Sequence, residues 1–82
     1  MYYVYLLKDE FSKIYIGYTH DLRKRLKEHL NKRVFTTKRM GNIKLIYYEA
    51  YWSEDLAKLR EKKLKQFGST YQGLIKRLGL KK

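Results

Sequence analysis

Alternating runs of apolar and polar residues divide the chain into short segments, and three of these are predicted to be strands. Residues 2–8, 13–19 and 43–51 are rich in the aromatic, aliphatic and β-branched residues that are typical of strands. The polar stretch DEFS separates the first two, so we expect them to pair as a hairpin. Gly17 lies inside the second, where a glycine indicates a bulge or a close approach of another group to the backbone.

Leucines at helical spacing follow the second predicted strand. Leu22, Leu26 and Leu30 recur at i, i+4 and predict a helix with a buried leucine stripe. We expect Thr19 to be the N-cap of this helix, with Asp21 in its first turn.

Two further helices are predicted in the last third of the chain. Ser53 is the expected N-cap of the first, and Gly68 would end it in a left-handed conformation. The second spans about residues 70–78, with Gly79 beyond it. Residues 31–42 have no clear period and are expected to be a loop. The order ββαβαα predicts an α+β fold, a small three-stranded antiparallel sheet flanked by helices.

The length and composition limit the class of protein. A chain of 82 residues fits one domain, residues 1–82, with a thin core. The absence of cysteine excludes disulfides and thiolate zinc sites and favours a reducing compartment, so we expect a cytoplasmic protein. No apolar run has the length of a membrane span, and the N-terminus does not resemble a signal peptide.

The charge predicts a polyanionic partner. Twenty lysines and arginines against eight acidic residues leave a net charge of +12, and aromatic residues are interleaved with the cations, which favours nucleic acid. A solvated basic surface and an anionic membrane are the alternatives. Four cations in the predicted loop are candidate nucleic-acid contacts. They are Lys32, Arg33, Lys38 and Arg39.

Two tyrosines are predicted to share one face of the hairpin. If its loop has an odd number of residues, Tyr5 faces Gly17 across the strands and Tyr15 lies diagonally beside it. Because Gly17 has no side chain, it would leave room above the sheet for a phosphate. The alternative is that both tyrosines are ordinary core residues.

Helical spacing brings further polar residues into candidate positions. Arg25 and His29 are four residues apart, so they lie on one flank of the first helix and can converge on one anion. An exposed basic helix face is the alternative. Glu61 lies on one line with apolar residues of the second helix, which places a carboxylate at the edge of the apolar stripe and makes it a candidate site residue. The alternative explanation is that Glu61 forms an i, i+4 salt bridge with Lys65.

The paired strand motifs resemble a known family. YVY at residues 3–5 and YIG at residues 15–17 are similar to the signature of the GIY-YIG endonucleases, with Tyr3 where the first glycine is usual. YIGYTHDLRKRLKEHL resembles the second strand and first helix of that family, and LAKLREKKLKQF resembles its second helix. The chain as a whole resembles small, stand-alone bacterial members and the catalytic domain of excinuclease C.

This resemblance implies a nuclease that cleaves DNA, including branched or damaged DNA, with Mg²⁺ or Mn²⁺. It implies Tyr5 as general base on water, with Tyr15 positioning water or phosphate. Arg25 would stabilise the transition state, and either Arg25 or a proton relay through His29 would favour the phenolate. Glu61 would bind the metal ion. The expected products have 5′-phosphate and 3′-hydroxyl ends.

Two other functions remain open from the sequence. One is a non-catalytic nucleic-acid-binding module, and the other is a nuclease component that needs a protein partner for substrate recognition. Many larger members of the resembled family have an asparagine about a dozen residues after the glutamate. This chain has Gly73 there, and the sequence leaves open whether Gln72 replaces it. Substrate structure, sequence preference, the choice of DNA over RNA, oligomeric state and pathway are open too.

Overall fold

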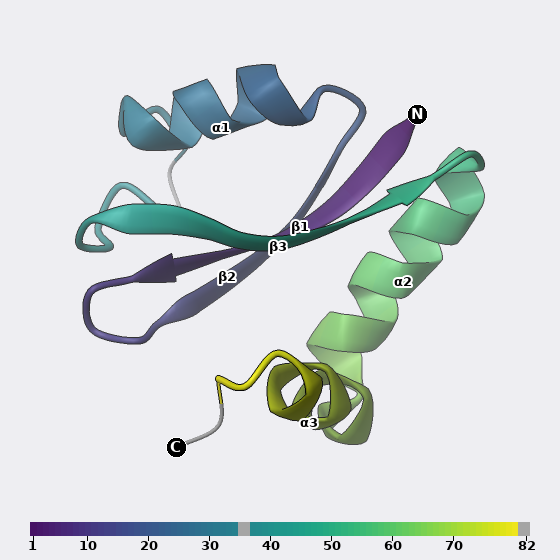
Figure 1. The fold of residues 1–82 in the computed structure, drawn as a ribbon. Helices are drawn as coiled ribbons and strands as arrows, with labels where there is room; N and C mark the ends of the chain where they lie inside the picture. The colour runs from purple at the N-terminus through teal and green to yellow at the C-terminus, as the bar shows by residue number, and fades with distance from the viewer. Residues whose placement is uncertain (35–36, 81–82) are drawn as a thin grey trace.

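Three strands and three helices form an α+β fold in the predicted order ββαβαα (Figure 1). This computed structural model describes residues 1–34 and 37–80. The elements are β1 (Tyr2–Asp9), β2 (Ile14–Thr19), α1 (Leu22–Leu30), β3 (Ile43–Tyr51), α2 (Glu54–Gln66) and α3 (Gly68–Arg77). The predicted fold class is confirmed, and the third strand has the predicted bounds. Among the described residues, no helix combines the length and the apolar character that crossing a bilayer requires.

The sheet is antiparallel, with β1 between β2 and β3. The first hairpin pairs Tyr5 with Gly17, as the odd loop length predicts, and its register runs through Gly17 without a bulge. Asp9 holds the hairpin turn because its Oδ1 accepts hydrogen bonds from the backbone N–H groups of Phe11 and Lys13, at 2.9 and 2.8 Å. The two strand motifs are therefore fixed next to each other.

A β-bulge interrupts the pairing of β1 with β3. The register shifts between Leu6 and Leu7, and Ile46 is the extra residue on β3. In a regular strand Leu45 and Tyr48 would lie on opposite faces, because they are three residues apart. Their partners on β1 are two residues apart and share a face, so the bulge brings Leu45 and Tyr48 to the same face of the sheet.

The two faces of the sheet are covered unequally. Figure 1 shows α2 and α3 against one face and the single helix α1 against the other. The main core lies on the face with two helices, and its buried members are Val4, Leu6, Ala57, Leu64, Leu74 and Ile75. Because side chains alternate along a strand, Tyr5 and Leu7 point to the α1 face, where both are fully buried.

The start and the buried side of α1 differ from the prediction. The N-cap is Asp21, whose side chain accepts a hydrogen bond from the N–H of Lys24 at 3.0 Å, while the Thr19 hydroxyl accepts the N–H of Asp21 at 3.1 Å. The expected buried leucine stripe is wrong, since Leu30 is 55% exposed and Leu22 and Leu26 are only half-buried. The fully buried residue of this helix is His29. A polar side chain therefore occupies the best-covered position of α1.

The last two helices are joined by one extended residue. Ser53 caps α2 as predicted, since its hydroxyl accepts the N–H of Leu56 at 3.3 Å. The prediction that Gly68 ends this helix is wrong, because Gly68 is the first residue of α3 and Phe67 alone makes the bend, with φ −109° and ψ 104°. A left-handed glycine occurs instead after α3, at Gly79, with φ +74°.

Candidate active site

A hydrogen-bonded chain of three buried side chains lies on the α1 face of the sheet. The Tyr5 hydroxyl and Nε2 of His29 are 2.7 Å apart, and Nδ1 of His29 is 2.7 Å from the Thr37 hydroxyl. Tyr5 comes from the central strand, His29 from the last turn of α1, and Thr37 from the loop before β3. All three residues are about 1% exposed. The phenol, imidazole and threonine hydroxyl thus form one continuous path for a proton.

Tyr15 completes an aromatic cluster around this chain. Its ring centroid lies 5.0 Å from that of His29 and 6.2 Å from that of Tyr5. The two phenols share one face as predicted. Tyr15 is only half-buried, so it connects the buried chain to the surface.

The structure gives Gly17 a different role from the predicted one. A Cβ atom at this position would overlap the hydroxyl and the terminal ring carbon of Tyr5. The space expected to receive a phosphate is therefore filled by the Tyr5 phenol. Gly17 is needed because Tyr5 reaches His29 across it.

Arg25 is half-buried and lies beside the hydrogen-bonded side chains of Tyr5, His29 and Thr37. Its Nη1 donates to Oε1 of Glu28 at 3.1 Å. Burial would lower the pKa of Arg25, but the hydrogen bond with Glu28 and the interaction with Tyr5 outweigh burial and raise it. The guanidinium is thus a permanent positive charge next to the Tyr5 phenol.

Burial and neighbouring charges set the protonation states of Tyr5 and His29. Burial, and next the neighbouring Tyr15, raise the pKa of Tyr5 far above its usual range, although Arg25 opposes this. Burial, and next Arg25, lower the pKa of His29. At neutral pH the phenol is therefore protonated and the imidazole is neutral.

Two proton arrangements satisfy both hydrogen bonds of a neutral imidazole. In one, Tyr5 donates to Nε2 of His29, and Nδ1–H donates to Thr37. In the other, Thr37 donates to Nδ1, and Nε2–H donates to the Tyr5 oxygen. The hydrogen bond with Thr37 therefore decides whether Nε2 presents a lone pair or a proton to Tyr5.

The structure brings four of the five predicted catalytic residues together and places the fifth on another helix. Glu61 lies on α2, which packs on the opposite face of the sheet from His29. Its Oε2 forms an ion pair with Nζ of Lys65 at 3.2 Å, the predicted i, i+4 alternative. A groove lined by Tyr15 and Lys65 runs along the free edge of β2, where the two faces of the sheet meet.

The donor set for a divalent ion is small. In the parts of the chain that the structure describes, no three His, Cys, Asp or Glu side chains are grouped so that they could hold a metal ion. Glu61 is one partly exposed carboxylate, with its side chain 24% exposed. One carboxylate fits Mg²⁺, which keeps several waters and takes its other ligands from substrate phosphate. It would not fit an all-protein metal cage.

The basic loop, residues 31–42, is anchored beside the hydrogen-bonded side chains of Tyr5 and His29. Thr37 and Val34 point inward and are buried, while the four predicted nucleic-acid contacts are exposed. Lys32 also donates through Nζ to the backbone carbonyl of Met40 at 3.2 Å, which ties the two ends of the loop together. The cations of this loop are Lys32, Arg33, Lys38 and Arg39. The bond between Thr37 and His29 therefore joins the basic surface to the candidate site.

Thr37 is the site residue that the sequence reasoning missed. It lies eight residues after His29 in a segment without periodicity. Only the folded loop brings its hydroxyl to the imidazole, so no spacing rule points to it. A hydroxyl residue among cations gives no separate signal.

Comparisons with known proteins agree with this architecture. The family model of the GIY-YIG catalytic domain matches residues 1–74. The chain is 37% identical over 67 residues to the UPF0213 protein CPE1444 of Clostridium perfringens, which covers 80% of this chain and 72% of that protein. It is also similar to the solution NMR structure of the UPF0213 protein BH0048 of Bacillus halodurans, with a TM-score of 0.60 and 28% identity over 95% of this chain and 85% of that one. The buried tyrosine, the arginine and the matched strand pair thus lie in a GIY-YIG catalytic domain, and the chain belongs to that family.

Proposed function

We propose that this protein is a metal-dependent endonuclease that hydrolyses a phosphodiester bond of DNA. The observation that carries the proposal is the chain of Tyr5, His29 and Thr37 with Arg25 beside it, inside a GIY-YIG domain. The net charge of +12 suits a polyanionic substrate.

In this proposal Tyr5 is a general base that works through His29. Because the phenol is protonated at rest, it can take a proton from water only if it releases its own. The Tyr5 proton moves to Nε2 of His29 while the attacking water gives a proton to the Tyr5 oxygen, and the resulting hydroxide attacks phosphorus. His29 is suited to accept because it is neutral, and Nδ1–H then donates to Thr37.

Arg25 and Tyr15 act on the phosphate. The Arg25 guanidinium pairs with the non-bridging oxygens, whose negative charge grows in the transition state. Tyr15, at the half-buried edge of the cluster, positions the water or the phosphate.

Glu61 is the proposed ligand of Mg²⁺ or Mn²⁺. A hard divalent cation held there would stabilise the charge on the leaving 3′ oxygen. The Glu61 carboxylate pairs with Lys65, and Lys65 lines the same open groove as Tyr15 at the edge of the sheet. The products are a 5′-phosphate and a 3′-hydroxyl.

One set of observations favours a second candidate, a non-catalytic nucleic-acid-binding module. Tyr5 is 1% exposed, so its hydroxyl has little access to bulk water. Glu61 is engaged by Lys65. Such a module would keep the basic surface and would use the buried chain only as a hydrogen-bonded core.

A cleavage assay separates the two candidates. Labelled duplex, branched and single-stranded DNA are incubated with the protein in Mg²⁺ and in a chelator, and an RNA of the same sequence is included. The nuclease proposal predicts cuts only with metal, and much slower cutting by Arg25→Ala. Lys27→Ala is the matched control, because it removes the same charge from an exposed position of α1. Binding of these substrates without metal-dependent cuts would favour the binding module.

A further inference from the structure

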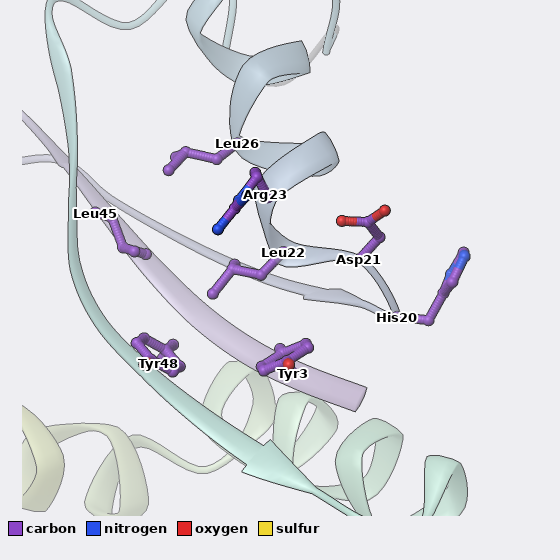
Figure 2. A pocket seen from close by; sticks show the side chains of 8 residues that line it. All are labelled: Tyr3, His20, Asp21, Leu22, Arg23, Leu26, Leu45 and Tyr48. Carbon is purple, nitrogen blue, oxygen red and sulfur yellow. The ribbon is translucent and has the colours of Figure 1, made fainter. Parts of the chain in front are cut away.

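An apolar groove lies on the other flank of α1 from the catalytic cluster. Figure 2 shows it between the first turns of α1 and the strands β1 and β3. Its volume is about 400 Å³. Three leucines from α1 and β3 line it together with Tyr3 and Tyr48. They are Leu22, Leu26 and Leu45.

The fold builds this groove in two ways. The single helix on this face covers it incompletely, so Tyr48 of β3 is 53% exposed. The bulge at Ile46 then turns both Leu45 and Tyr48 to the groove. Without the bulge, one of the two side chains would point to the opposite face.

Two aromatic rings form one wall of the groove. Tyr3 and Tyr48 pack edge to face, with centroids 6.1 Å apart and an interplanar angle of 63°. This geometry leaves a ring surface available to a flat ligand, because neighbouring edge-to-face rings do not cover each other's faces fully. Tyr3 occupies the position at which the YVY motif departs from a glycine.

The rim of the groove carries a cation. Figure 2 shows the Arg23 side chain reaching over the groove from α1. No hydrogen bond or ion pair joins Arg23 to another residue of the described ranges, 1–34 and 37–80. Asp21 also lines the groove, but its carboxylate is engaged as the N-cap of α1. The remaining rim residue is His20.

We infer that this groove binds one unpaired nucleotide of the substrate, with the base against Tyr3 and Tyr48 and the phosphate on Arg23. This inference rests on the proposed function. An aromatic and aliphatic slot with a guanidinium at its rim suits a flat ligand that carries one negative charge. A base inside a duplex is already stacked on its neighbours, so the bound nucleotide belongs to a single-stranded end, flap or bulge. The net charge of +12 favours nucleic acid over a protein segment as the occupant.

Binding without metal tests the groove separately from catalysis. Affinities are measured by fluorescence anisotropy in chelator for a blunt duplex, the same duplex with a single-stranded extension, and a single strand. Tyr48→Leu keeps an apolar side chain but removes the stacking surface, so it should weaken binding of the two single-stranded probes about tenfold. Binding of the blunt duplex should change less than about twofold. Tyr48→Phe should restore wild-type affinity for every probe.

Two further variants complete the experiment. Phe11→Leu is the matched control, because Phe11 is a 71% exposed aromatic residue at the hairpin turn and outside the groove, and it should change no affinity. Arg23→Gln, an exposed substitution that leaves the wall intact, should weaken binding of the single-stranded probes and lower their salt slope by about one.

The outcomes separate this inference from the nuclease proposal. The groove inference would be overturned if Tyr48→Leu changed the affinity for all probes equally, or for none, and Arg23→Gln also failed to distinguish the single-stranded probes from the blunt duplex. If the wild-type protein still cut DNA, the nuclease proposal would stand. If the wild-type protein bound none of the probes, both would fail.

Discussion

Thr37 determines how His29 can use its two nitrogens, and the variant Thr37→Val tests this role. Valine keeps the shape but removes the hydroxyl, so Nδ1 of a buried imidazole is left without its partner. We expect a decrease of about 1–3 kcal/mol in the free energy of unfolding. We also expect slower cleavage, with the acid limb of the pH–rate profile at lower pH, because the imidazolium is deprived of a hydrogen-bond acceptor.

Thr37→Ser is the control for this prediction, since it restores a hydroxyl at the same position. A purely structural role would lower the melting temperature of Thr37→Val and leave the shape of the pH–rate profile unchanged. That result would remove Thr37 from the proposed proton path.

Arg25 is predicted to act mainly in the transition state. Arg25→Ala should lower the cleavage rate by about 10²- to 10³-fold, which corresponds to about 2–4 kcal/mol in the barrier. Arg25→Lys should recover only part of this rate, because an ammonium cannot reproduce two parallel hydrogen bonds to phosphate. Single-turnover kinetics, with Lys27→Ala as the charge-matched control, measures both effects. Cleavage by Arg25→Ala at the wild-type rate would make Arg25 an ordinary partner of Glu28.

Glu61 distinguishes a metal ligand from a surface ion pair. Glu61→Gln keeps the side-chain size but removes the anion, so Mg²⁺-dependent cleavage should be abolished. Breaking the pair with Lys65 should cost less than about 1 kcal/mol of stability. DNA binding in chelator should persist or strengthen, because the variant raises the net charge by one from +12.

Asp55→Asn is the matched control for Glu61→Gln, because it removes one exposed carboxylate from the same helix. Cleavage, melting temperature and DNA affinity are measured on both variants. Normal cleavage by Glu61→Gln would end the single-metal mechanism with Glu61 as its ligand.

Single residues of the site differ in how far sequence could place them. Strand register puts Tyr5 opposite Gly17, and helical spacing puts Arg25 and His29 on one flank, so local geometry suffices for these four. The contents of the space above Gly17 could not be predicted this way. They depend on the rotamer of Tyr5, which the distant His29 fixes through a hydrogen bond.

At the level of elements, the loop of residues 31–42 is predicted to be the main phosphate-binding segment. Replacing its four cations with alanine should weaken DNA binding at every sequence, and the salt slope should fall by about one for each phosphate interaction that is removed. The fold should persist, because the cations are exposed, the hydrogen bond of Lys32 to Met40 that the variant breaks is exposed too, and the buried Val34 and Thr37 still anchor the loop. A salt titration of binding measures the slope. Unchanged affinity would place the DNA on another surface.

The elements themselves were predictable where one periodic signal dominates. The third strand, residues 43–51, is an uninterrupted β-type run, and Ser53 directly precedes a helical pattern. The bulge at Ile46 had no sequence signal, because bulges that use ordinary αR or β conformations need no glycine. The residue type of Gly68 alone predicts a helix end, but the structure has it as the first residue of α3.

Across the whole molecule, the loss of lysine charge and the ionisation of tyrosines change the stability of the folded state in opposite directions at high pH. Burial, and next a hydrogen bond to Glu49, raise the pKa of Tyr51 to about 12, and burial with the Glu54 bond raises the pKa of Tyr18 to about 12. The pKa of Tyr5 is raised further. An unfolded tyrosine has a pKa of about 10. The stability from these groups is therefore complete below about pH 10 and is lost as the pH rises towards about 12.

Deprotonation of lysines in the same range reduces the self-repulsion of a chain with net charge +12, which stabilises the folded state. Salt separates the two effects, because a Debye length of about 3 Å at 1 M salt screens charges on the surface but not the burial of phenols. We expect the melting temperature to fall steeply above about pH 10 in 1 M salt and less steeply in dilute buffer. Melting curves at both salt concentrations, with phenolate absorbance recorded on the same samples, test this expectation. A melting temperature that stays constant from about pH 9 to 12 in high salt would mean that the tyrosine pKa values are the same in the folded and unfolded states, and the raised pKa that we assign to Tyr5 would then be wrong.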